Sequence, residues 1–374
     1  MKFTASSSAL SNQIQAIGRV ISSRNTLPIL ECLLMSVEDK TLTITASDNE
    51  TTLKTTVELY ESDNNGDIAI SSKTLIDALK EIPEQPLTFE INKDTYEVCI
   101  KYMNGMYNMV GQNPEEYPSP AVLTDQAVYF DIDSETLSEG ITRSLFATAE
   151  DELRPVMNGI YFDITPDNLT FVASDGHKLV RNRLTSIKGK GESAFILPKK
   201  PASLLKSLLV RDASNVNIGF DERNAIFTIS GKSMVCRLIE GRYPNYNSVI
   251  PQNNPNRLTI DRLVMLSALK RVAVFSSQSS SLVRLRIKDN ELVISAQDID
   301  FSTSAMETLT CQYEGNPMSI GFKSNFLIDI LTNIPGQEIV IQLADPSRAG
   351  VIVPAEQIDD EDLLMLLMPM MLND

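Results

Sequence analysis

The stretch Phe171–Leu179, FVASDGHKL, is the clearest guide to the fold because the pattern of its first part occurs three times along the chain. Residues 168–175 (NLTFVASD) repeat the pattern of residues 41–48 (TLTITASD) and of residues 291–298 (ELVISAQD). Each copy alternates in the manner of a half-buried β-strand and closes with Ala-x-Asp. The closing aspartates are 127 and then 123 residues apart, so we expect three tandem copies of one domain.

A lysine followed by a helical pattern is the second feature that repeats. Lys73, Lys199 and Lys323 follow the three aspartates by 25, 24 and 25 residues. After each lysine, apolar residues recur at spacings of one, three and four, which predicts a helix with one buried face. A second strand is then predicted at residues 87–91, 216–220 and 339–343.

Each copy is also predicted to open with a helix. The apolar stripes are Leu10, Ile14, Ile17 and Ile21, then Leu137, Ile141, Leu145 and Ala149, and finally Leu263, Leu266, Leu269 and Ala273. Short turns such as Asp39-Lys40 and Asp289-Asn290 favour antiparallel strand pairing. The expected fold is therefore α+β, with domains at residues 1–123, 124–252 and 253–374, and repeated head-to-tail contacts favour a curved or closed assembly.

Composition narrows the class of protein. An apolar content of 43% is enough for packed cores, and a net charge of −16 argues against a protein that holds nucleic acid by its overall charge. No run of about 18 apolar residues and no signal-peptide pattern occurs, so we expect no membrane association. The scattered residues Cys32, Cys99, Cys236 and Cys311 predict buried, reduced thiols and a cytoplasmic location.

The usual catalytic motifs are missing. The chain has one histidine, no Gly-x-Ser-x-Gly and no complete phosphate-binding loop, and its cysteines lack zinc-ligand spacing. Asp131-Ile132-Asp133 and Asp298-Ile299-Asp300 could supply metal ligands, although exposed strand ends are the simpler interpretation. Because Asp48, Asp175 and Asp298 recur in all three copies, we predict that they form turns rather than one active site. We expect no enzyme activity and no cofactor.

Cations and an apolar tail point to binding instead. A lysine at a helix start opposes the helix dipole, yet it attracts phosphate, and it recurs in all three copies. Arg19, Arg24, Arg143, Lys270 and Arg271 add positive charge in or near the opening helices, so we expect the cations to be gathered on one surface. Residues 363–368 are predicted to form a core strand. The Met-rich residues after Pro369 are predicted to line a groove for peptides.

These features resemble the bacterial DNA polymerase III beta subunits, the sliding clamps, along the whole chain. The most specific matches are residues 26–30 (TLPIL), 174–179 (SDGHKL), 241–246 (GRYPNY) and 368–370 (MPM). The resemblance implies a homodimer: a ring of two three-domain chains joined head to tail around double-stranded DNA, with helices lining the hole and sheets outside. Such a ring is a non-catalytic processivity factor for DNA replication that reads no sequence. Its partners would be the replicative DNA polymerase catalytic subunit, the clamp loader and other proteins with a clamp-binding motif.

The resemblance also assigns residues to sites. The peptide-binding groove would comprise Met157, Ser174, Gly176, His177, Lys178, Leu179, Pro244, Val249, Met368, Pro369 and Met370. The DNA-facing residues would be Arg24, Lys73, Arg143, Lys199, Lys200, Arg271 and Lys323. The dimer interface would place Tyr107 and Met109 of one chain against Val274 and Phe275 of the other.

Three departures and two alternatives accompany this interpretation. Pro155-Val156 replaces an aromatic pair of some members, Ser248 replaces a basic residue, and Asn373-Asp374 extends past the usual end. One alternative function is a metal-dependent enzyme that uses the repeated aspartates. The other is a peptide-binding scaffold that never meets DNA.

Overall fold

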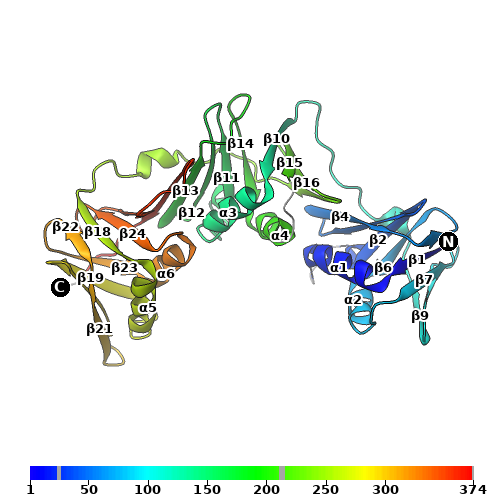
Figure 1. Ribbon diagram of the computed structural model, residues 1–374, viewed down its shortest axis with the longest axis horizontal. Coiled ribbons are helices and arrows are strands. Elements are labelled where there is room, and N and C mark those ends of the chain that lie inside the picture. Colours follow the sequence, from blue (N-terminus) through cyan, green and yellow to red (C-terminus); the bar gives the residue numbers. More distant parts are fainter. Residues whose placement is uncertain (23–26, 210–214, 373–374) are drawn as a thin grey trace. The chain divides into compact units, whose positions relative to one another are not determined.

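The computed structural model describes residues 1–22, 27–209 and 215–372 (Figure 1). Arg24, Thr26, Asn373 and Asp374 lie outside the described residues. The chain forms two compact units, one of Met1–Ser138 with Ser203–Leu238 and one of Glu139–Ala202 with Ile239–Asp374. Helices α3 (Ser134–Leu145) and α4 (Lys199–Leu209) are each divided between the units.

The first unit contains two antiparallel sheets and two complete helices. The five-stranded sheet runs β5 (Glu61–Ser62), β1 (Lys2–Ser6), β7 (Pro86–Ile91), β8 (Glu97–Tyr102) and β9 (Gly105–Val110). The eight-stranded sheet runs β10 (Val128–Asp133), β15 (Asn215–Phe220), β16 (Asn224–Ile229), β17 (Lys232–Arg237), β4 (Thr51–Glu58), β3 (Thr41–Ser47), β2 (Cys32–Glu38) and β6 (Gly66–Ser71). Helices α1 (Ser7–Ile17) and α2 (Ser72–Lys80) pack together against it.

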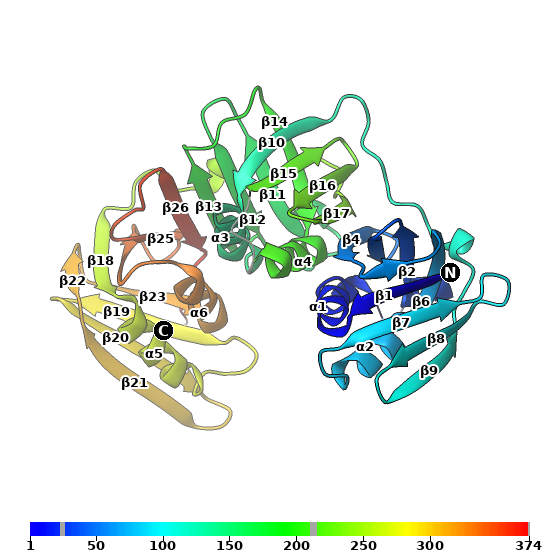
Figure 2. The ribbon, with the colours of Figure 1, turned by 45° about the vertical axis from the view of Figure 1, so that its right-hand side comes forward.

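The second unit repeats this plan. Its nine-stranded sheet runs β14 (Ser193–Pro198), β11 (Gly159–Ile164), β12 (Leu169–Ser174), β13 (Lys178–Leu184), β26 (Glu361–Leu367), β25 (Gly350–Pro354), β24 (Glu338–Leu343), β18 (Asn256–Asp261) and β22 (Gln312–Glu314). The four-stranded sheet runs β21 (Thr303–Thr310), β20 (Glu291–Asp298), β19 (Leu282–Lys288) and β23 (Met318–Lys323). Helices α5 (Arg262–Ala273) and α6 (Ser324–Asn333) lie side by side (Figure 2).

Local signals explain where these elements begin and turn. Ser6 Oγ accepts a hydrogen bond from the Ala9 N–H at 3.1 Å and caps α1, and Asp261 caps α5 through the Val264 N–H at 2.9 Å. Asp289 and Asn290 take the left-handed backbone conformation that a tight hairpin needs. The repeated strands become β3, β12 and β20, and the lysine-led helices become α2, α4 and α6. Each of these three strands pairs antiparallel with its neighbours, as predicted.

Some helix positions were predicted wrongly. Leu266 and Leu269 of the predicted α5 stripe are buried, but Leu263 is 56% exposed, because Met265, Ala268 and Val272 complete the buried face. Ile21 lies beyond α1, which ends at Ile17, and Ala149 lies beyond α3 although it is buried. Three of the cysteines are buried as expected, but Cys99 is only half-buried.

The repeated aspartates form turns, as predicted. The Oδ1 atom of Asp48 accepts backbone hydrogen bonds from residues 50 and 51, that of Asp175 from residues 177 and 178, and that of Asp298 from residues 300 and 301. Asp133 caps α3 by accepting from the Glu135 and Thr136 N–H groups. Across the described ranges, no three His, Cys, Asp or Glu side chains are gathered as a metal would require, and no helix there could cross a membrane.

Candidate functional site

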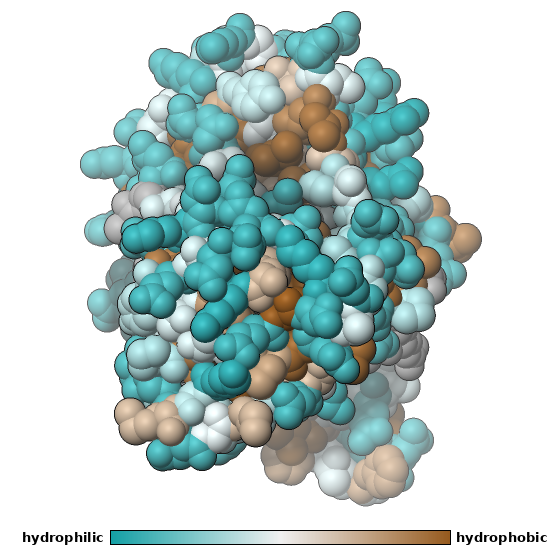
Figure 3. Space-filling model, turned by 90° about the vertical axis from the view of Figure 1, so that its right-hand side faces the viewer, coloured by the Kyte–Doolittle hydropathy of each residue, from teal (hydrophilic) through white to brown (hydrophobic). Residues whose placement is uncertain are grey.

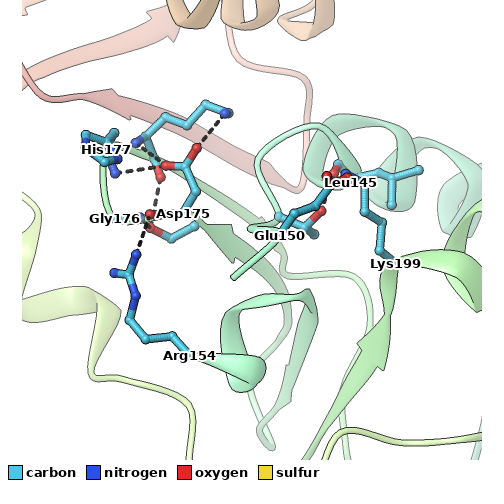
Figure 4. Close-up of polar contacts among 10 residues, drawn as sticks. Leu145, Glu150, Arg154, Asp175, Gly176, His177 and Lys199 are labelled. Atoms are coloured by element: carbon cyan, nitrogen blue, oxygen red, sulfur yellow. Dashed lines mark hydrogen bonds and ion pairs between the residues drawn. The ribbon is translucent and has the colours of Figure 1, made fainter. Parts of the chain in front are cut away.

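The turn between β12 and β13 is held by several hydrogen bonds to Asp175 (Figure 4). The Oδ1 atom of Asp175 accepts the His177 and Lys178 N–H groups, both at 2.9 Å, and its Oδ2 accepts from Lys178 Nζ at 2.7 Å. Gly176 has φ +90°, and a Cβ there would lie 2.8 Å from Nη1 of Arg154. The positive φ favours glycine at this position, while the Arg154 guanidinium, at the end of a flexible side chain, could move aside for a Cβ.

Lys178 is buried, although it carries a charge. Lys178 is 5% exposed. Its Nζ forms an ion pair with Asp175 and lies 4.2 Å from the centroid of the Phe326 ring on α6. Burial raises the pKa of Asp175, but the hydrogen bonds from Lys178 and His177 lower it by more, so this carboxylate is ionised at neutral pH. The ion pair and the ring together hold the turn in one position.

Phe326 is a site residue that sequence reasoning missed. Its ring centroid lies 5.8 Å from that of His177 and 4.9 Å from Nζ of Lys323. In the sequence it reads as one more apolar position of the helix after Lys323. Only the packing of α6 against the β12–β13 turn identifies it as a neighbour of the groove.

The C-terminal tail reaches the same turn through strand pairing. Strand β26 pairs with β13 so that Leu367 lies opposite Lys178, and the Met368 N–H then donates to the His177 carbonyl at 2.8 Å. The core strand predicted at residues 363–368 is observed as β26, which ends one residue earlier, at Leu367. Beyond Pro369, the Met370 N–H donates to the Gly321 carbonyl at 2.8 Å.

An apolar cluster lies beside the turn and the tail. It consists of Val172, Leu179, Ile196, Tyr243, Tyr246, Ile250, Ala349 and Leu366. Tyr161 stacks on Tyr243 with centroids 4.7 Å apart, and the Tyr246 hydroxyl donates to Asp163 at 2.8 Å. Burial, and then that hydrogen bond to Asp163, raise the pKa of Tyr246 to about 12.

The predicted groove residues fall into a buried base and an exposed rim. Met157, Ser174, Lys178 and Leu179 are buried, Gly176, His177, Pro244, Val249 and Met368 are exposed, and Pro369 and Met370 are half-buried. Val249 is 57% exposed and Met368 is 42% exposed, so two large apolar side chains of the rim face solvent. Exposed apolar residues beside an apolar cluster mark a surface for a protein or peptide partner.

A shallow hollow of about 440 Å³ borders the same turn and contains charged side chains. Arg154 Nε donates to Asp151 at 2.8 Å, and its Nη2 reaches the Asp175 carbonyl at 3.4 Å. On the other side of the hollow, Lys199 Nζ lies 2.5 Å from a carboxylate oxygen of Glu150 (Figure 4).

Comparison with known proteins gives the family. Models of the DNA polymerase III beta subunit match as its N-terminal domain at residues 1–122, its central domain at 131–245 and its C-terminal domain at 247–371. The chain belongs to this family. It therefore has the clamp fold, with three clamp domains of mixed helix and sheet.

Relatives match this clamp chain over its full length. The beta sliding clamp of Pseudomonas putida is 26% identical and that of Haemophilus influenzae 27% identical, each with 100% of both chains covered. A crystal structure of a DnaN sliding clamp from Pseudomonas aeruginosa bound to griselimycin superposes with a TM-score of 0.94 at 26% identity, covering 100% of both chains. A Bartonella birtlesii clamp bound to griselimycin gives a TM-score of 0.93 at 25% identity, with the same coverage.

The cations assigned to the DNA face of the clamp have differing surroundings. Lys73 and Lys200 are exposed near the starts of α2 and α4, and Lys323 is half-buried at the N-cap of α6. Lys199 pairs with Glu150, and Arg271 forms a two-pronged ion pair with Glu307 at 2.7 and 2.6 Å.

Arg143 requires a correction. It is only 7% exposed, and it pairs with the exposed Glu139 at 2.8 Å and with the buried Glu361 of β26. Burial lowers the pKa of Arg143, and Glu139 opposes that shift. Its guanidinium is enclosed by the protein, so Arg143 is not assigned to the DNA face.

The residues assigned to the dimer interface of the clamp lie near sheet edges or in the open. Tyr107 and Met109 are half-buried on β9, the edge strand of the five-stranded sheet. Val274 is 79% exposed and Phe275 is 40% exposed just after α5. Figure 3 shows the side of the first unit on which β9 lies, where apolar side chains interrupt a mainly hydrophilic surface.

Proposed function

We propose that two copies of this chain close head to tail into a ring around duplex DNA and tether the replicative polymerase through the groove beside Asp175. The observation that carries this proposal is the bond between Met368 and His177, since it brings the C-terminal tail to the turn beside an apolar cluster. The result is a surface with a buried base and an exposed apolar rim. A peptide can add apolar contacts there without disturbing the fold.

The ring closure is supported by two strand edges that pair with no other strand among the described residues. Strand β9 ends the five-stranded sheet and β21 ends the four-stranded sheet, so each presents free backbone donors and acceptors. Exposed apolar residues accompany both edges, among them Met106 at 62% and Met306 at 68%. The contact of Tyr107 and Met109 with Val274 and Phe275 of a second copy belongs to this proposal, as do the domain boundaries after residues 123 and 252.

The DNA contact would be electrostatic and without base recognition. Exposed lysines near helix starts can approach phosphates, while encirclement rather than overall attraction would keep an acidic protein on DNA. The chain would therefore carry no catalytic activity, and it would act in the bacterial cytoplasm. The clamp loader and other proteins with a clamp-binding motif would share the groove with the polymerase.

Retention on DNA tests the proposal directly. The protein, loaded by its clamp loader onto a nicked circular plasmid, should remain bound during gel filtration and leave once the plasmid is cut. Equal retention on circular and linear DNA would refute the ring. A protein that binds polymerase peptide but is never retained on circles would instead be a scaffold without a DNA function.

A further inference from the structure

Two of the cations assigned to DNA are already held by carboxylates of the same chain. Lys199 Nζ lies 2.5 Å from Glu150, and Arg271 donates two hydrogen bonds to Glu307. We propose that Glu150 and Glu307 compete with DNA phosphates for Lys199 and Arg271, and thereby lower the affinity of the ring for DNA. This inference rests on the proposed encirclement of DNA.

The surroundings of Lys199 make such an exchange easy. Lys199 is the first residue of α4, where the helix dipole repels a cation and a carboxylate offsets that repulsion. Both side chains are exposed, Lys199 at 42% and Glu150 at 79%, so the pair is weak and solvent-screened. A phosphate at the same helix start can therefore replace Glu150 without unfolding anything.

The second pair is arranged differently but has the same consequence. Glu307 on β21 is only 29% exposed and receives both prongs of the guanidinium, whereas Arg271 is 60% exposed near the end of α5. The hydrogen bond from Arg271 lowers the pKa of Glu307, and that from Lys199 lowers the pKa of Glu150. Both carboxylates are therefore ionised at neutral pH, and each cation starts out neutralised.

A neutralised cation changes how binding depends on salt. Each phosphate that a free cation contacts releases counterions and steepens the plot of log K against log salt by about 0.9. A cation that must first leave a carboxylate adds little to the free energy of DNA binding, because one ion pair is exchanged for another. The two carboxylates therefore keep DNA contacts weak, which suits a ring that must slide.

Glu150→Gln tests this inference, with Glu152→Gln as the matched control. Glu152 is exposed on the same loop and forms no ion pair among the described residues, so both variants change the net charge equally. Binding of the dimer to a short fluorescent duplex is followed by anisotropy over a range of sodium chloride concentrations. We expect E150Q to steepen the slope by up to about 0.9 and to tighten binding several-fold at low salt, while E152Q matches the unmodified protein.

Further variants identify the cation and the second pair. Adding Lys199→Met to E150Q should abolish the tighter DNA binding and the steeper salt slope. Glu307→Gln should also steepen the slope, whereas Glu314→Gln, a control at an exposed residue of β22, should not. Sedimentation of every variant checks that the dimer persists. Equal slopes for E150Q and E152Q in a protein retained on circular DNA would overturn the inference alone. Absence of retention in the unmodified protein would overturn the proposed function.

Discussion

Replacing Glu361 with Gln tests whether Arg143 is a structural residue of the second unit. The Arg143 guanidinium pairs with two carboxylates that differ mainly in burial, since the Glu361 side chain is 6% exposed and that of Glu139 is 51% exposed. Removing one partner of a buried ion pair costs about 3–5 kcal/mol, because the remaining charge stays unpaired in the interior. An exposed helical pair is worth only about 0.3–0.5 kcal/mol.

We expect E361Q to lower the free energy of unfolding of this unit by about 3 kcal/mol, the low end of that range, because Glu139 still pairs with the guanidinium and the amide keeps one acceptor. At about 2–4 °C per kcal/mol, the melting temperature should fall by about 6–12 °C. E139Q should lower the free energy by about 0.5 kcal/mol or less. Urea and thermal unfolding are followed by far-ultraviolet circular dichroism.

A double variant completes this experiment. Arg143→Met with Glu361→Met should recover most of the stability, since an apolar pair can replace a buried ion pair. Similar losses in E361Q and E139Q would refute the reasoning. Arg143 would then be loosely held, and its assignment to the DNA face would have to be restored.

The groove, the interface and a buried tyrosine each allow a further test. Deleting the chain from Met368 onward should abolish binding of a fluorescent polymerase peptide yet leave the dimer intact in sedimentation; a monomer would show that the tail belongs to the interface. Phe275→Asp should convert the dimer to monomer by burying an unpaired charge, and a persistent tight dimer would make that assignment wrong. Because the folded pKa of Tyr246 is about 12, against about 10 in an unfolded chain, its contribution to stability is complete below pH 10 and is lost as pH rises to 12. Tyr246→Phe should flatten that alkaline loss in urea titrations, and an unchanged pH profile would contradict the assignment.

Most of the secondary structure could be predicted from local sequence patterns. The strands that lead to Asp48, Asp175 and Asp298 could be predicted because alternation and a turn-forming acid are properties of neighbouring residues. The lysine-led helices could be predicted for the same reason. Leu263 was placed wrongly because Met265 and Val272 also lie within reach of the face marked by Leu269, and only packing decides which side of that face is buried.

Charges were harder to interpret than apolar residues. Arg143 lies on one of the predicted opening helices, and nothing in its own segment shows that it pairs with the buried Glu361 side chain. The sequence shows that Lys199 and Arg271 carry positive charge. Only the fold shows that Lys199 pairs with Glu150 and that Arg271 pairs with Glu307. The partner of a charged side chain is set by tertiary contacts. The sequence alone therefore gives the sign of the charge but does not show whether the side chain is free to bind DNA.

Sequence patterns were enough to predict three domain copies, their strands and turns, and the segment Gly176–Lys178 that only the middle copy has. Tertiary contacts were needed to show that β13 pairs with β26, which brings Met368 to His177, and that α6 packs so that Phe326 meets Lys178. The physical reason is that an apolar strand can pair with many others. Its partner is selected by the packing of whole sheets, and no residue near it in the chain records that selection.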